Sequence, residues 1–184
     1  MNNIIIILLL SLIFGLTMKL CDLMDEHGLR WFRGDAILFG IIWGFFGAML
    51  ITSNNTVANF VLAMMVAFII RKRIDSYPHT IATGIVLISF LNIASVEPFT
   101  FWFFLVAIGL FGAIRDYYGN TRKTKDWLFW LNEPAWYYLI PPLLYSYLTG
   151  NWLISGVSII YIAGYDWIKY YYQGFTKNNT SVRP

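Results

Sequence analysis

The stretch Lys19-Leu-Cys-Asp-Leu-Met-Asp-Glu-His-Gly28 ends the first long apolar run of the chain and gathers acids, a lysine and a histidine. Charged groups are costly in the hydrocarbon core of a membrane, so such a cluster marks the point where an apolar helix leaves it. Other apolar runs also end on an acid beside a base, at Arg71-Lys-Arg-Ile-Asp75, Arg115-Asp116 and Asp166-Trp-Ile-Lys169. The interpretation of the function therefore depends on whether these four ends meet.

The composition is typical of a membrane protein. Of the 184 residues, 58% are hydrophobic and 12% are charged, whereas soluble domains carry about 25% charged residues. Helices satisfy their own backbone hydrogen bonds in lipid, so we expect an all-α polytopic transmembrane helix bundle. The connectors are too short to fold separately, so residues 1–172 are predicted to form a single transmembrane domain.

The apolar runs predict about seven membrane spans. They lie at about 3–21, 36–52, 56–70, 80–95, 98–114, 134–149 and 151–168. Several are shorter than the roughly 20 residues that a helix needs to cross the hydrocarbon core, so we expect basic residues at their ends to extend to the headgroups.

The positions of Lys and Arg predict the orientation. With the N-terminus outside, all thirteen fall in the inside segments, at about 19–35, 71–79, 115–133 and from 169 onward. The positive-inside rule therefore predicts an outside N-terminus, a cytoplasmic C-terminus and a multi-pass protein of the cell membrane. The net charge of +3 reports this orientation, and no nucleic-acid partner is expected. The polar segment 173–184 is predicted to be a disordered cytoplasmic tail.

Glycine and proline mark two further features of the apolar runs. Gly40, Gly44 and Gly47 include a Gly-x-x-x-Gly pattern, which predicts close approach of another helix backbone. Pro141-Pro142 removes two helix donors within the sixth run and predicts a kink or a break of the helix there. The carbonyl groups that such a kink frees favour an internal polar pocket.

The acids after the first run form a candidate metal site. If that helix continues past the membrane boundary, Asp22 shares a face with Asp25 and Glu26, with Lys19 one turn earlier. Clustered carboxylates repel unless a cation lies among them, and Lys19, Arg30 or a divalent ion could serve. Hard oxygen ligands suit Mg²⁺, which often bridges carboxylates to a substrate phosphate.

The other charged ends offer phosphate ligands and further acids. Arg71 and Arg73 could hold a phosphate by charge-assisted bonds, or could simply anchor the helix at the membrane boundary. Asp166 lies inside an apolar run, where ionisable groups usually have a function; an ion pair with Lys169 is the alternative. His27 and His79 are interpreted as loop histidines, since no His/Cys spacing predicts a zinc site.

The motif Asp22-Leu-Met-Asp25-Glu26 resembles the aspartate-rich motif of UbiA-type intramembrane prenyltransferases. Cys21 stands where that family has Asn, and Leu29 stands where its third Asp falls. The resemblance implies an all-helical enzyme whose cytoplasmic acids hold Mg²⁺ and a prenyl diphosphate. Arg115-Asp116 and Asp166 would then belong to the second acidic cluster.

Two hypotheses follow from these patterns. The first is an integral membrane enzyme that transfers a prenyl or phospholipid group at the cytoplasmic face, with a membrane-lipid environment and a phosphorylated lipid or isoprenoid substrate. Its metal ligands would be Asp22, Asp25 and Glu26. Its substrate-binding residues would be Lys19, Arg71, Arg73 and Arg115. Its catalytic residues would be Asp75, Asp116 and Asp166. The second is a non-enzymatic membrane subunit or small-solute transporter, whose charged rim serves topology and docking of protein partners that the sequence leaves undefined.

Overall fold

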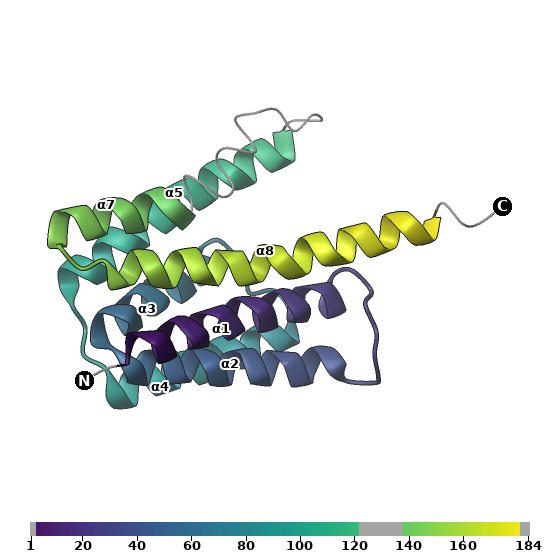
Figure 1. Cartoon of the computed structure of the whole chain (residues 1–184), viewed down its shortest axis with the longest axis horizontal. Helices are drawn as coiled ribbons and strands as arrows, with labels where there is room; N and C mark the ends of the chain where they lie inside the picture. Colours follow the sequence, from purple (N-terminus) through teal and green to yellow (C-terminus); the bar gives the residue numbers. More distant parts are fainter. Residues whose placement is uncertain (1–2, 122–137, 181–184) are drawn as a thin grey trace.

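The computed structural model describes the backbone of residues 3–121 and 138–180, and the side chains of 3–117 and 138–172. This part of the chain contains seven helices and no strand, which confirms the predicted all-α fold (Figure 1). The helices are α1 (Ile4–Asp25), α2 (Asp35–Ser53), α3 (Asn55–Ile70), α4 (Tyr77–Ile93), α5 (Pro98–Thr121), α7 (Ile140–Thr149) and α8 (Leu153–Thr180).

The helices follow the predicted apolar runs closely. Within the described residues, α1, α2 and the segment Pro98–Tyr117 of α5 are long and apolar enough to cross a membrane, and α3 and α4 are shorter apolar helices. α8 continues to Thr180, into the segment 173–184 for which the sequence predicted a disordered tail. The predicted start of the sixth run at 134 and most of the predicted inside segment 115–133 lie outside the described residues.

The helices pack as a bundle in which neighbours along the chain run in alternate directions. α8 lies beside α1 and α7, and α2 lies between α1 and α4, while α3 packs on α5 (Figure 1). This order brings the carboxyl ends of α1, α3, α5 and α8 to one end of the bundle, together with the amino ends of α2 and α4. We call this the charged end, because it contains the segments 19–35 and 71–79.

Apolar side chains fill the bundle and also cover its outside. Phe14, Trp43 and Phe104 are fully buried between the helices. Large apolar residues such as Leu91 and Val106 point outward and are well exposed. Helices that are apolar on all sides are typical of proteins surrounded by lipid.

Glycines allow two pairs of helices to approach closely. A Cβ on Gly40 would lie 2.6 Å from the carbonyl oxygen of Pro78 in α4, and one on Gly44 would lie 2.9 Å from the Cα of Ala82. This confirms the close approach predicted from the Gly-x-x-x-Gly pattern. On the other side of the bundle, α8 crosses α1 in the same way, because a Cβ on Gly15 would collide with the backbone of Tyr161.

Pro141 and Pro142 begin a helix rather than kink one. They lie in the first turn of α7, where a backbone N–H has no helical partner to lose, and a helix that begins here agrees with a break in the sixth run. The carbonyl of Pro142 accepts a hydrogen bond of 3.0 Å from the Ser155 hydroxyl of α8. The Tyr138 carbonyl lies four residues before Pro142 and has no proline N–H to accept from, and it accepts a hydrogen bond of 2.6 Å from the Ser158 hydroxyl of α8 instead.

Candidate functional site

Three helices meet on the carboxylate of Asp22, near the end of α1. The Tyr165 hydroxyl of α8 donates a hydrogen bond of 2.7 Å to Asp22 Oδ2, and Lys19 Nζ donates one of 3.4 Å to the same oxygen. His79 Nε2 of α4 lies 3.0 Å from the other oxygen, Oδ1, at ion-pair distance but without hydrogen-bond alignment. Asp22 therefore joins α1, α4 and α8.

The groups around Asp22 are themselves packed and buried. Lys19 is 7% exposed and His79 is 5% exposed. Lys19 Nζ also lies 3.3 Å from the Tyr165 hydroxyl and 4.8 Å from the centre of its ring. The edge of the His79 ring meets Trp43, with 5.5 Å between ring centres. Buried charges of this kind are tolerated because they are paired.

His79 belongs to a helix, whereas the sequence placed it in a loop. Pro78 lies at the start of α4, where its fixed φ favours a first helical turn, and His79 follows it. The backbone of Pro78 packs closely against Gly40 of α2. With the first turn of α4 in this position, the His79 ring lies between the helices and faces Asp22 of α1. The backbone therefore explains why a histidine next to a charged connector is buried.

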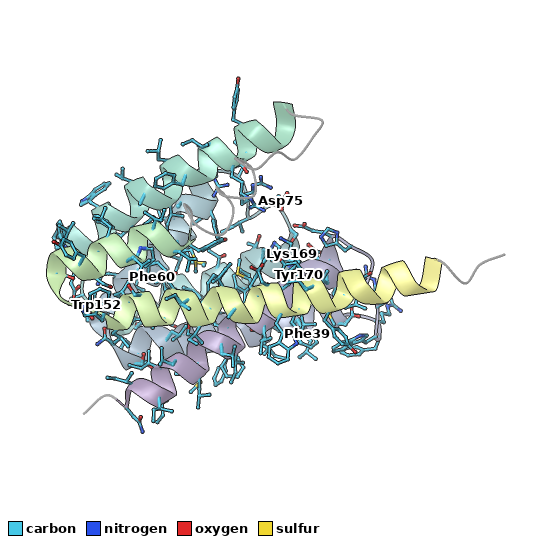
Figure 2. All side chains as sticks on the ribbon, turned by 45° about the horizontal axis from the view of Figure 1, so that its top comes forward. Phe39, Phe60, Asp75, Trp152, Lys169 and Tyr170 are labelled. Carbon is cyan, nitrogen blue, oxygen red and sulfur yellow. The ribbon has the colours of Figure 1, made fainter. Side chains whose placement is uncertain are left out.

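A second group lies beside Asp22 and contains Glu26, Asp75 and His79. Each offers one possible metal-ligating atom, and these atoms all lie within 4.8 Å of one another. Glu26 caps α1, Asp75 lies in the connector between α3 and α4, and both acids are exposed. In Figure 2, Asp75 and Lys169 of α8 lie on one half of the molecule, away from Trp152 at the opposite end of the bundle. We call Glu26, Asp75 and His79 the acid–histidine group.

A third group links the end of α3 to α5. Arg71 donates two hydrogen bonds to Asp116 Oδ2, of 3.1 Å from Nε and 2.7 Å from Nη2, and Arg73 Nη2 donates to Oδ1. The guanidinium of Arg71 lies over Gly112, where any Cβ would collide with it. The side chain of Arg71 is 7% exposed and that of Arg73 is 52% exposed. Arg71 is therefore a structural link, while Arg73 stays accessible.

Replacing Asp116 with asparagine should lower the free energy of unfolding by about 1–3 kcal/mol, because the buried Arg71 guanidinium loses its charged acceptor. Arg73→Gln removes the exposed partner of the same carboxylate and should cost less than about 1 kcal/mol. Denaturant titration of both variants in detergent checks the ranking. A larger loss for Arg73→Gln would contradict the structural assignment of Arg71.

The residues predicted to form one site are divided among the three groups described above. Lys19 and Asp22 are buried together, Glu26 joins Asp75, and Asp116 joins Arg71 and Arg73. Other predicted residues, namely Asp25, Arg115 and Asp166, are half-buried on α1, α5 and α8.

Arg30, one of the cations considered for Asp22, pairs instead with Asp35 at 3.3 Å. The Asp35 carboxylate also accepts a hydrogen bond from the Trp31 amide. Arg30 therefore helps to hold the turn before α2.

Sequence reasoning missed Tyr165 and Trp43 as members of the site. One signal was available for Tyr165, because a tyrosine hydroxyl within an apolar run needs a polar partner. The partner could not be identified, since Asp22 lies 143 positions earlier in the chain. Trp43 gives the same kind of signal through its indole N–H, but its position in an apolar run is explained equally well by packing in the core.

No protein-family model, curated protein or solved structure matches this chain.

Proposed function

We propose that the chain is an integral membrane enzyme that acts on a phosphorylated lipid or isoprenoid at the cytoplasmic face, by metal-dependent prenyl or phospholipid transfer. One observation carries the proposal. The acid–histidine group brings three possible metal ligands within 4.8 Å of one another, and the connector that supplies Asp75 also supplies Arg73. Metal ligands on the same connector as a half-exposed guanidinium form a combination that suits a phosphate.

Each group would have a separate task in this reaction. Arg73, which is half-exposed, would hold the phosphate, and Asp116 would keep its guanidinium in place. A divalent cation, with Mg²⁺ the ion predicted from the sequence, would stabilise the charge of a departing diphosphate. Arg115 and Asp166, on α5 and α8, are proposed to complete the polar lining. The apolar outer faces of the helices suit the lipid tail.

The metal ligands of the proposal differ from the set suggested by the sequence. Asp22 was paired there with Asp25 and Glu26, yet its oxygens are taken up by Lys19, Tyr165 and His79. Glu26 and Asp75, being exposed, are better able to reach an ion and a phosphate from outside the bundle. We therefore assign Asp22 and Lys19 to holding the site together.

Mass spectrometry of the lipids that co-purify with the protein, with and without divalent cations, tests this function. A phosphorylated lipid or isoprenoid should be retained, and Arg73→Gln should reduce its amount about tenfold, as the loss of about 1.4 kcal/mol of binding energy would do. Arg33→Gln is the matched control, because it removes a positive charge from an exposed position at the same end of the bundle. Retention of the same unselected lipids by all three proteins would contradict the proposal.

The alternative is a non-enzymatic membrane subunit or small-solute transporter, and one observation favours it. The two most enclosed ion pairs at the charged end, those of Asp22 and Asp116, link helices to one another. Under this alternative, Arg73→Gln and Asp75→Asn would alter stability or partner binding without changing the lipids retained. The co-purification experiment therefore separates the two functions.

A further inference from the structure

We infer that Glu26, Asp75 and His79 form a binding site for a first-row transition-metal dication, such as Mn²⁺ or Zn²⁺, in preference to Mg²⁺. The inference rests on the proposed function for the use of the metal, but binding can be measured without any lipid. The site differs from the acidic set Asp22, Asp25 and Glu26, because it combines residues of α1, the α3–α4 connector and α4.

The spacing of the ligand atoms suits a single ion. Metal–ligand distances of about 2.0–2.2 Å place two ligands of one ion at most about 4.4 Å apart. The three atoms already lie within 4.8 Å of one another. Glu26 and Asp75 are exposed and free to adjust their rotamers, so a small closing movement brings them into the coordination range.

His79 is held in an orientation that a metal ligand requires. Its ring is 5% exposed, its edge packs on Trp43, and Nε2 faces Asp22 Oδ1 at 3.0 Å. Asp22 holds the ring through Nε2, and Nδ1 must give up its proton before it can bind a metal ion. Metal-bound histidines are commonly oriented by a carboxylate behind the ring in this way. Asp22 is fixed in turn by Tyr165 and Lys19.

The two negative charges of Glu26 and Asp75 also favour a bound cation between them. Glu26 and Asp75 place two like charges close together, which is unfavourable unless a positive group lies among them. Among the described residues, neither acid has a lysine or arginine nitrogen at ion-pair distance. The only basic side chain of the group is His79, and its Nε2 already faces Asp22.

The mixed ligand set determines which metal is preferred. Mg²⁺ selects oxygen ligands and keeps several waters, whereas an imidazole nitrogen favours Mn²⁺, Fe²⁺, Co²⁺ or Zn²⁺. Three protein ligands leave coordination positions open for water or for an oxygen of a phosphate. Arg73, two positions before Asp75, lies in the same connector and could contact that phosphate.

A titration of the detergent-purified, chelator-treated protein with Mn²⁺ tests the inference. The electron paramagnetic resonance signal of Mn²⁺ measures how much of the ion stays free. The wild-type protein should bind one Mn²⁺ per chain, with little displacement by a tenfold excess of Mg²⁺. Glu26→Gln and Asp75→Asn should each weaken binding about tenfold or more, since removing even a group that only orients a metal ligand costs about 10- to 100-fold in affinity. Because both acids are exposed, these variants should unfold at the wild-type temperature.

Asp25→Asn is the matched control, since it removes a carboxylate one position before Glu26 and should leave Mn²⁺ binding unchanged. Absence of Mn²⁺ binding would overturn the inference and would assign His79 as the cation that neutralises the acids. An equal loss for Asp25→Asn, or equal competition by Mg²⁺, would overturn it as well. Phosphorylated lipid retained without Mn²⁺ binding would reject the metal site alone, and Mn²⁺ binding without such lipid would reject the proposed function alone.

Discussion

The Asp22→Ala variant is expected to lose about 3–5 kcal/mol of unfolding free energy, the cost of removing one partner from a buried ion pair. The substitution leaves the buried Lys19 and His79 without their carboxylate, and the Tyr165 hydroxyl without its acceptor. The α1 helix itself should persist, because alanine is the best helix former. The loss should therefore arise from the contacts between helices.

Chemical unfolding in detergent, followed by tryptophan fluorescence, measures this effect. Asp25→Ala is the control, because Asp25 is half-buried on the same helix and its removal should cost less than about 1 kcal/mol. Asp22→Asn, which keeps the acceptor oxygen but loses the charge, should fall between the two. Equal stability of the two alanine variants would show that Asp22 does not hold α1, α4 and α8 together.

The second large effect is expected at Gly15, where one added methyl group should cost about 3 kcal/mol or more. Overpacking typically costs about 1–3 kcal/mol, and the obstacle here is the Tyr161 backbone of α8, which cannot rotate away as a side chain does. Gly15→Ala should therefore push α8 from α1. The same displacement should lengthen the hydrogen bond from Tyr165 to Asp22.

Gly109→Ala provides the opposite case, because no atom lies within 4 Å of the added Cβ. Its stability should stay the same or rise by up to about 1 kcal/mol, the usual gain of alanine over glycine within a helix. Thermal unfolding of both variants in one detergent checks the difference in sign. A Gly15→Ala protein as stable as Gly109→Ala would mean that α1 and α8 lie farther apart than described.

The sequence predicted the helices well because their limits are local. The turn between α2 and α3 is an example: Asn54 ends one apolar run and accepts a hydrogen bond from the Val57 amide to begin the next helix. The ion pair of Lys19 with Asp22 could also be predicted, because residues three apart share a helical face. Interactions within one helix can be deduced from spacing alone.

Contacts between helices could not be predicted from spacing. The partners of Asp22 depend on which helices approach α1, and that choice is made by small residues such as Gly15 and Gly40, whose neighbours lie far along the chain. Burial was equally hidden, since nothing in the sequence distinguishes the enclosed Asp22 from the exposed Glu26. The mistaken assignment of His79 to a loop has the same origin, because its inward position depends on the packing of α4 against α2.

The order of the partners of Asp22 along the chain has a consequence for biosynthesis. Lys19 is made just before Asp22, so the charge of Asp22 has a partner as soon as the first helix exists. His79 follows with α4, whereas Tyr165, the donor at 2.7 Å, arrives only with the final helix of the described chain. The contacts of Asp22 therefore form in stages. In a nascent chain without α8, the Asp22 carboxylate still lacks its tyrosine donor. Completion of this contact therefore marks the docking of α8 on α1.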